Sequence, residues 1–168
     1  MRFARLALPA LLCASLSAPL FAADTIDADD FVDEASAGGI AEIEGGKLAL
    51  EKSSSASVKT FAQQMIDDHG AANRKLAVLA REKKLEVATE AELMSKAKAL
   101  ILKLRDGENF DEAYANNQVA AHEKTIELFK EAAASDDKEI AAWATKTLPK
   151  LEHHLQMARD LAATHKKP

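Results

Sequence analysis

Four polar residues stand where an amphipathic helical pattern calls for apolar ones: Glu42, His69, His122 and His154. Each lies on the inward-facing stripe of a different long predicted helix. One carboxylate and three imidazoles form a sensible ligand set for a transition metal. In helical bundles such sites are built from side chains on facing helices. We therefore predict a mononuclear metal site for Cu, Zn, Fe or Mn.

The elements that must position these residues are helices almost throughout, because apolar residues recur three and four positions apart. The pattern predicts long helices over residues 29–52, 58–84, 110–132 and onward from 138, with a shorter helix over 90–104. Long helices with one apolar stripe each bury it most simply as an antiparallel bundle. We predict an all-α, ferritin-like four-helix bundle with the extra short helix in the long connection between helices 2 and 3.

The depth of the four polar residues supports their convergence. Counted from the predicted helix starts they lie about 11 to 17 residues in, or roughly 17–26 Å along each helix. Positions near the middle of a helix share one level whichever way the helix points. The four side chains are therefore expected in a single layer of the bundle interior.

Several local signals bear on the packing of these helices. Ser57 is expected to cap the second helix, and Pro149 to kink or break the fourth. Glycine pairs at 38–39 and 45–46 bracket Glu42, which indicates close approach of another helix or a ligand, or local flexibility.

A structural role for the same layer stays open. A lone imidazole on an apolar face is usually a hydrogen-bonded core residue, and Glu42 paired with a protonated imidazole would fix the register of the helices. Asp68 and Tyr114 are candidates to support the ligands from behind, although Asp68 points away from its neighbour His69. His153 is expected at the surface and is the reserve ligand. His165, near the end of the chain, is assigned no role.

The first 23 residues have the features of a secretory signal peptide. Arg2 and Arg5 precede an apolar stretch over residues 6–16, which is too short to span a bilayer, and cleavage is expected after Ala22 or Ala23. Residues 24–168 then form one domain in the periplasm. No later segment resembles a membrane span.

The charge and cysteine content exclude several classes of protein. The formal net charge is −5, and loss of the two leader arginines makes it more negative, which argues against nucleic acid as the main partner. The single cysteine, Cys13, leaves with the leader, so the mature chain has no thiol for disulfides, thiolate zinc sites or nucleophilic catalysis.

Several segments resemble the domain of unknown function 4142 family. The residues that carry the resemblance are Gly39-Ile40-Ala41-Glu42-Ile43-Glu44, Phe61-Ala62-Gln63-Gln64-Met65-Ile66-Asp67-Asp68-His69, Phe110-Asp111-Glu112-Ala113-Tyr114, Ala121-His122-Glu123-Lys124 and Thr147-Leu148-Pro149-Lys150-Leu151. The resemblance implies a secreted bacterial helical bundle of ferritin-like fold, often labelled an outer membrane protein. Its recurring positions correspond to Glu42, His69, His122 and His154. No activity is established for the family, so it implies fold and compartment rather than a reaction.

Three functions are consistent with these features. We favour a non-catalytic periplasmic metal-binding protein, although the mature chain has only three methionines and thus no methionine-rich Cu(I) tract. The second is an envelope-stress or interaction module without metal, acting as a homo-oligomer or with an envelope protein. The third is a metal-dependent oxidoreductase; a di-iron enzyme is disfavoured because paired Glu-x-x-His motifs are absent.

Overall fold

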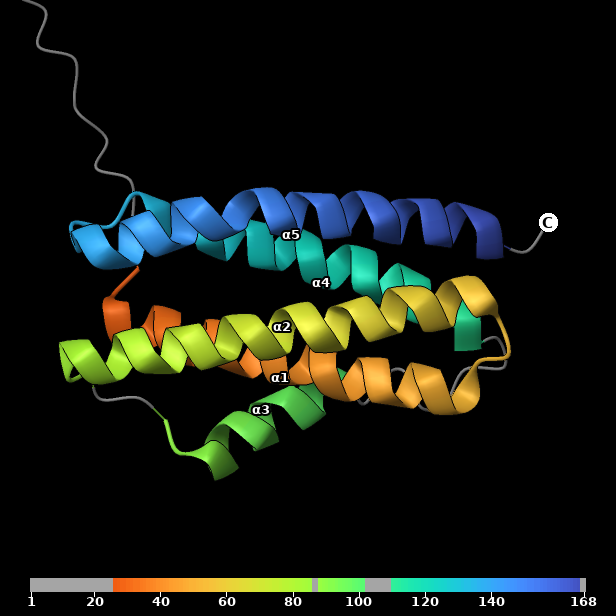
Figure 1. Cartoon of the computed structure of the whole chain (residues 1–168), viewed down its shortest axis with the longest axis horizontal. Coiled ribbons are helices and arrows are strands. Elements are labelled where there is room, and N and C mark those ends of the chain that lie inside the picture. Colours follow the sequence, from red (N-terminus) through yellow and green to blue (C-terminus); the bar gives the residue numbers. More distant parts are fainter. Residues whose placement is uncertain (1–25, 86–87, 102–109, 167–168) are drawn as a thin grey trace, which may run out of the picture.

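The computed structural model describes residues 26–85, 88–101 and 110–166. Within them the chain forms five helices: α1 Ala28–Lys52, α2 Ala56–Lys83, α3 Glu90–Ile101, α4 Phe110–Ala133 and α5 Lys138–His165. The four long helices pack in two pairs, α1 with α2 and α4 with α5, and α3 lies against α1 (Figure 1). The predicted all-α bundle with a short additional helix is confirmed. The predicted signal peptide and the end of the predicted helix 90–104 lie outside the described residues.

The helix ends follow capping chemistry. The side chain of Asp137 accepts hydrogen bonds from the amides of Glu139 and Ile140 and begins α5. The helix α2 begins at Ala56 with Ser55 as its cap, so the prediction of Ser57 was two residues late. Lys84, with φ of 56°, ends α2 in the left-handed conformation.

The helix α5 continues across Pro149 without interruption, so the predicted break does not occur. Proline removes one backbone donor, which costs stability in a helix interior. Buried Ala144 and Leu151 lie on either side of Pro149 and anchor both halves of α5 in the core. Packing therefore outweighs the local cost.

Close approach of α1 and α2 explains two of the glycines. A Cβ atom at Gly46 would lie 2.9 Å from the backbone carbonyl oxygen of Ala62, and one at Gly39 would overlap the side chain of Asn73. At Gly38, by contrast, a Cβ atom would meet no other side chain or neighbouring helix of the described residues within 4 Å. The prediction of a close helix approach is confirmed at Gly39 and Gly46.

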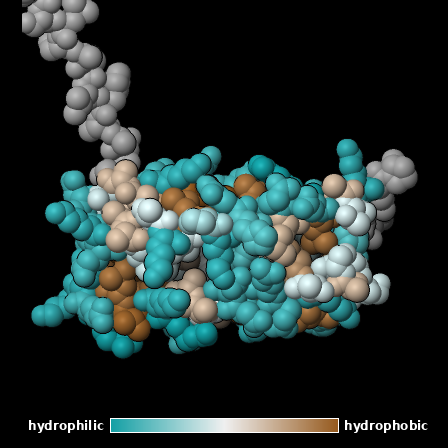
Figure 2. Space-filling view, turned by 45° about the horizontal axis from the view of Figure 1, so that its top comes forward, coloured by the Kyte–Doolittle hydropathy of each residue, from teal (hydrophilic) through white to brown (hydrophobic). Residues whose placement is uncertain are grey.

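Two apolar clusters fill the described interior. The Phe61 cluster holds one end of the bundle and comprises Ala41, Ala49, Val58, Phe61, Ala62, Met65, Ala97, Tyr114, Ala115, Ala158 and Leu161. The Phe31 cluster holds the other and comprises Phe31, Val32, Ala35, Leu76, Ala80, Ile126, Phe129, Ala132, Ile140, Ala144 and Leu151. The outer face in Figure 2 is covered mainly by hydrophilic side chains with small separate apolar areas. None of the helices in the described ranges combines the length and apolar character needed to cross a membrane.

Candidate metal centre

A layer of buried polar side chains separates the two apolar clusters. On α2, His69 lies between Met65 and Leu76, and on α5, His154 lies between Leu151 and Ala158. The residues of each set belong to one helical stripe, because they are spaced by three, four or seven positions. Burial of these apolar neighbours in the core turns the same face of each helix inward, so the imidazole on that face is buried too.

Three of the predicted ligands meet in this layer. The ring centroids of His69 and His122 are 5.5 Å apart, those of His69 and His154 5.4 Å, and those of His122 and His154 5.5 Å. The residues are 7%, 1% and 1% exposed, respectively. One ring nitrogen from each lies within 4.8 Å of those of the other two. Three separate helices thus place three imidazoles at the corners of a nearly equilateral triangle.

Hydrogen bonds at the back of two rings define which nitrogen is available. The Nδ1–H of His122 donates to the backbone carbonyl of Gln118 at 2.9 Å, and the Nε2–H of His154 donates to Asp68 Oδ2 at 2.9 Å. Because both acceptors lack a proton, the opposite nitrogen of each neutral ring carries the lone pair. Among the described residues, His122 Nε2, His154 Nδ1 and His69 Nε2 are buried without a hydrogen-bond partner.

The electrostatics of the layer keep the rings of His69 and His154 neutral. Burial, aided by the neighbouring imidazoles, lowers the pKa of His69 to about 3. Burial also lowers the pKa of His154 to about 4, although its hydrogen bond to Asp68 acts in the opposite direction. A metal competes with protons for imidazole nitrogens, so unprotonated rings are ready donors at neutral pH.

The cluster fits the size of a transition-metal ion. Nitrogens about 2.0–2.1 Å from a metal in trigonal or tetrahedral arrangement lie roughly 3.3–3.6 Å from one another. The three nitrogens start within 4.8 Å, so small ring rotations bring them to this spacing. Hydrogen bonds from ligand histidines to a carbonyl or carboxylate are the usual supports of such sites.

The fourth predicted ligand, Glu42, is buried beside the cluster. Burial raises the pKa of its carboxyl group, while nearby His122 and a hydrogen bond from Gln118 lower it. Its Oε2 has no partner, but the carboxylate is not part of the three-nitrogen group. Its ligation of a metal stays a prediction. Gln118 was not identified from the sequence as a site residue, although a glutamine on an inward stripe was a visible signal.

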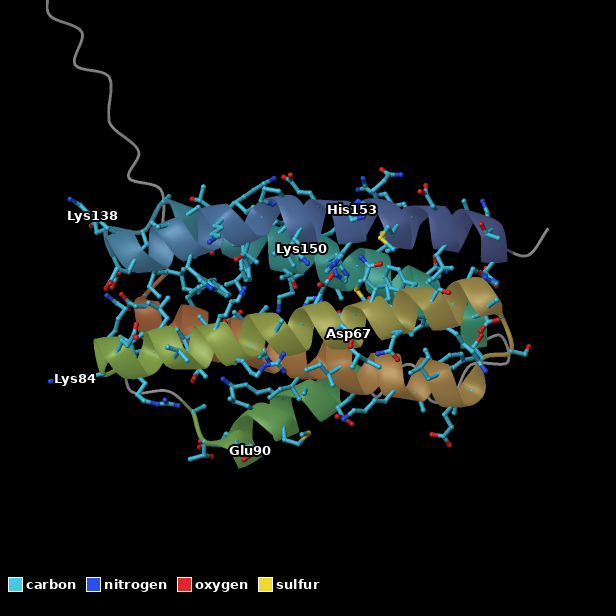
Figure 3. All side chains as sticks on the ribbon, in the orientation of Figure 1. Asp67, Lys84, Glu90, Lys138, Lys150 and His153 are labelled. Atoms are coloured by element: carbon cyan, nitrogen blue, oxygen red, sulfur yellow. The ribbon has the colours of Figure 1, made fainter. Side chains whose placement is uncertain are left out.

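The supporting residues fall in different places. Asp68 contacts the layer through His154 of another helix rather than through its neighbour His69. Tyr114 is fully buried, with its hydroxyl unpaired, and burial and Glu42 both raise its pKa. The reserve ligand His153 is exposed on α5 (Figure 3) and lies outside the cluster. His165, which was assigned no role, contacts Ser55 and Ser57 at the start of α2 through Nε2 of its ring.

Comparison with known proteins places the chain by sequence and by fold. The family model described as Domain of unknown function (DUF4142) matches residues 15–161. No curated protein sequence matches the chain significantly. Among solved structures, CopM in the Cu(II)-bound form superimposes with a TM-score of 0.65 at 10% sequence identity, covering 83% of this chain and 98% of that chain. At this identity the likeness shows a shared fold.

Proposed function

The chain belongs to the DUF4142 family, and from this premise we propose that it is an exported, non-catalytic protein that binds one transition-metal ion, copper before the others, at His69, His122 and His154. The observation that carries the proposal is the buried cluster of three imidazoles from three helices. One ring nitrogen of each lies within 4.8 Å of those of the other two, and His69 Nε2, His122 Nε2 and His154 Nδ1 have no hydrogen-bond partner. Unpaired buried polar atoms cost stability, and coordination of a metal would remove that cost.

Donor chemistry favours copper. Imidazole nitrogens suit copper and zinc, and at a given site the affinity of divalent ions is highest for Cu(II). The solved CopM structure with the same fold is a Cu(II)-bound form. Zn, Fe and Mn are the other ions to be compared. Glu42 beside His122 and Asp68 behind His154 would supply negative charge against the charge of the ion.

Two features support the remaining parts of the proposal. The three rings are nearly inaccessible to solvent, which suits binding more than turnover of a substrate. The signal-peptide pattern predicted over residues 1–23 supports export to the periplasm, where a copper-binding bundle would buffer the ion or contribute to stress tolerance.

The test is metal content together with thermal stability. Protein exported to the periplasm would be analysed for bound metals, and the metal-free protein melted with Cu(II), Zn(II), Mn(II) and Fe(II). A ligand at a hundred times its Kd stabilises the folded state by about 2.7 kcal/mol. We expect a stabilisation of this kind with Cu(II) in the wild type. The control is His153→Ala, which should keep it, because His153 is exposed on the same helix as His154 and lies outside the cluster. We expect its loss in His69→Ala and in His122→Ala.

One observation favours a second function. The hydrogen bonds of His122 to Gln118 and of His154 to Asp68 would also serve a purely structural polar network, as in an interaction module without metal. Absence of bound metal, with no melting shift for any ion, would establish this alternative over metal binding. Turnover of an oxidant by the loaded protein would instead indicate an oxidoreductase.

A further inference from the structure

The two helix pairs meet loosely along the seam between α2 and α5. These helices approach each other at few points, whereas α1 with α2 and α4 with α5 pack along their length. In the middle of the seam Asp68 of α2 bridges to α5, with Oδ1 2.6 Å from Lys150 Nζ and Oδ2 2.9 Å from His154 Nε2. A polar bridge thus joins α2 and α5 where their backbones approach each other at few points.

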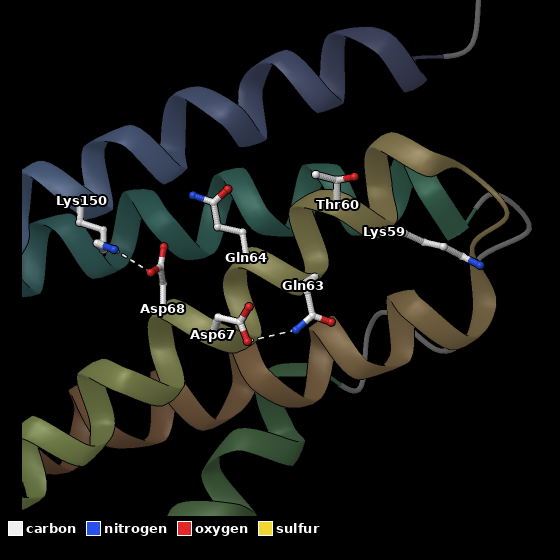
Figure 4. Close-up of a pocket in the computed structure, with 7 residues that line it drawn as sticks. All are labelled: Lys59, Thr60, Gln63, Gln64, Asp67, Asp68 and Lys150. Carbon is white, nitrogen blue, oxygen red and sulfur yellow. Dashed lines mark hydrogen bonds and ion pairs between the residues drawn. The ribbon is translucent and has the colours of Figure 1, made fainter.

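Surface hollows lie on both sides of this bridge. One, of about 760 Å³, is shown in Figure 4 and is lined by Lys59, Thr60, Gln63, Gln64, Asp67, Asp68 and Lys150. The other, of about 250 Å³, has Asp68, Lys75, Trp143, Lys146 and Lys150 in its lining. Asp68 and Lys150 line both hollows, so their ion pair separates one hollow from the other.

Asp68 connects the outside of the bundle with the three-histidine cluster. Its side chain is 22% exposed, and one oxygen meets the exposed ammonium group of Lys150 while the other meets the buried ring of His154. His69 is the next residue along the chain. The carboxylate therefore touches solvent-accessible charge on one side and a member of the cluster on the other.

We propose that Asp68 is the uptake ligand that passes a metal cation from the larger hollow to the three-histidine cluster, and that the ammonium group of Lys150 blocks this route while it is paired with Asp68 and so acts as a latch. The proposal rests on the proposed function, since it concerns how the same cluster is loaded. A displaced Lys150 frees Asp68 Oδ1 for an incoming cation, and the adjacent imidazoles then take the cation over.

The ligands along the route favour movement of the cation from the surface to the cluster. A partly exposed carboxylate, with the side-chain oxygens of Thr60, Gln63 and Gln64 lining the same hollow, offers a hydrated divalent cation oxygen ligands. Imidazole nitrogens inside bind copper more tightly than such oxygens do. Lys150 carries the same sign of charge as the incoming ion and occupies the carboxylate, so it slows both uptake and release.

The rate of metal uptake tests the latch. Trp143 is the only tryptophan in the chain and lies on α5, the helix of His154, so quenching of its fluorescence reports Cu(II) binding in a stopped-flow experiment. We expect Lys150→Met to speed uptake about tenfold, because it removes a repulsive charge at a narrow route. Release should accelerate as well, so the equilibrium affinity should change much less than either rate.

Lys146→Met is the matched comparison. Lys146 lines the smaller hollow and carries the same charge, whereas the ion pairs of Asp68 are with Lys150 and His154. We expect Lys146→Met to change the uptake rate by less than about threefold, an effect of charge alone. Equal acceleration by the two variants, or none by Lys150→Met, would overturn the latch.

Asp68→Asn tests the uptake ligand itself. The amide oxygen can still accept from His154 Nε2–H, but the negative charge is gone, so we expect uptake to slow about tenfold or more while Cu(II) still binds at equilibrium. Uptake at the wild-type rate would overturn the role of Asp68. If the wild-type protein takes up no Cu(II), the proposed function itself fails, and this outcome differs from binding with unchanged rates.

Discussion

The Phe31 cluster and the polar layer are buried to a similar degree but are built in opposite ways. In the Phe31 cluster aromatic rings pack edge to face: the ring centroid of Phe31 lies 5.1 Å from that of Phe129 and 6.0 Å from that of Trp143, which packs against the cluster. In the layer, His69, His122 and His154 lie as close together, yet each leaves one nitrogen unpaired. The clusters stabilise the fold, whereas the unpaired buried nitrogens of the layer cost free energy, which a bound metal ion would recover.

The fold can tolerate a destabilising polar layer because of where the layer lies. On each of the four long helices the polar residue lies between residues of the Phe61 cluster and residues of the Phe31 cluster. Apolar packing on both sides fixes the helices, so the layer does not have to hold them together. Substitutions in the two regions should therefore affect stability with opposite signs.

Phe31→Ala should give the largest effect. Phe31 is fully buried and contacts two other rings, so its truncation should lower the free energy of unfolding by about 3–5 kcal/mol. Urea denaturation of the metal-free protein would measure the loss. Val78→Ala is the control, because Val78 is 46% exposed and should cost less than about 0.5 kcal/mol. A similarly small cost at Phe31 would contradict the division between cluster and layer.

Acid should lower the free energy of unfolding of the metal-free protein, because two histidines of the layer have lowered pKa values. The pKa values of His69 and His154 are lowered from 6.5 to about 3 and about 4, so the unfolded chain binds more protons than the folded one between these values. The free energy of unfolding therefore falls as the pH falls below 6.5, by about 2 kcal/mol per histidine between pH 7 and pH 5. Glu42 acts oppositely, because its raised pKa lets the folded state keep a proton above pH 4.5.

Urea denaturation at pH 7, 6 and 5 would measure this slope, with His69→Gln as the comparison. The variant lacks one of the two depressed histidines, so its loss of stability on acidification should be about half that of the wild type. Identical slopes would show that the His69 ring is protonated in the folded protein or accessible to solvent.

The fold and the three-histidine cluster were predictable because they depend on periodicity. Apolar spacing of three and four residues determines which face of a helix is buried, and His69, His122 and His154 occupy that face at similar depths. Mid-helix residues meet in an antiparallel bundle whatever the details of the loops. The same argument located Glu42 in the layer, although not its separation from the three nitrogens.

The partners of these residues were not predictable, because they depend on how helices far apart in the sequence are rotated against each other. Asp68 lies beside His69 in the chain but hydrogen-bonds to His154, 86 residues away. The persistence of α5 across Pro149 also depends on tertiary packing, which outweighs the local preference. Neither feature follows from the spacing of apolar residues.

Replacement of a ring in the layer by an apolar side chain should stabilise the metal-free protein. His122→Leu removes a buried nitrogen without a partner and keeps a similar volume, so the free energy of unfolding should rise by about 1–2 kcal/mol. The stabilisation by Cu(II) should disappear in the same variant. Denaturation with and without the ion measures both. A loss of stability without metal would show that the His122 ring belongs to a satisfied structural network.

His165→Ala should have the smallest effect, and it separates the chemistry of the ring from its position. His165 lies at the end of α5, where Nε2 is 3.3 Å from Ser55 Oγ and 3.2 Å from Ser57 Oγ, outside the layer and partly open to solvent. Exchange of these contacts for water should cost less than about 1 kcal/mol. Melting curves should show the same Cu(II) shift as the wild type. If that shift were lost, copper would be bound at the end of the bundle, and the layer would be a structural feature alone.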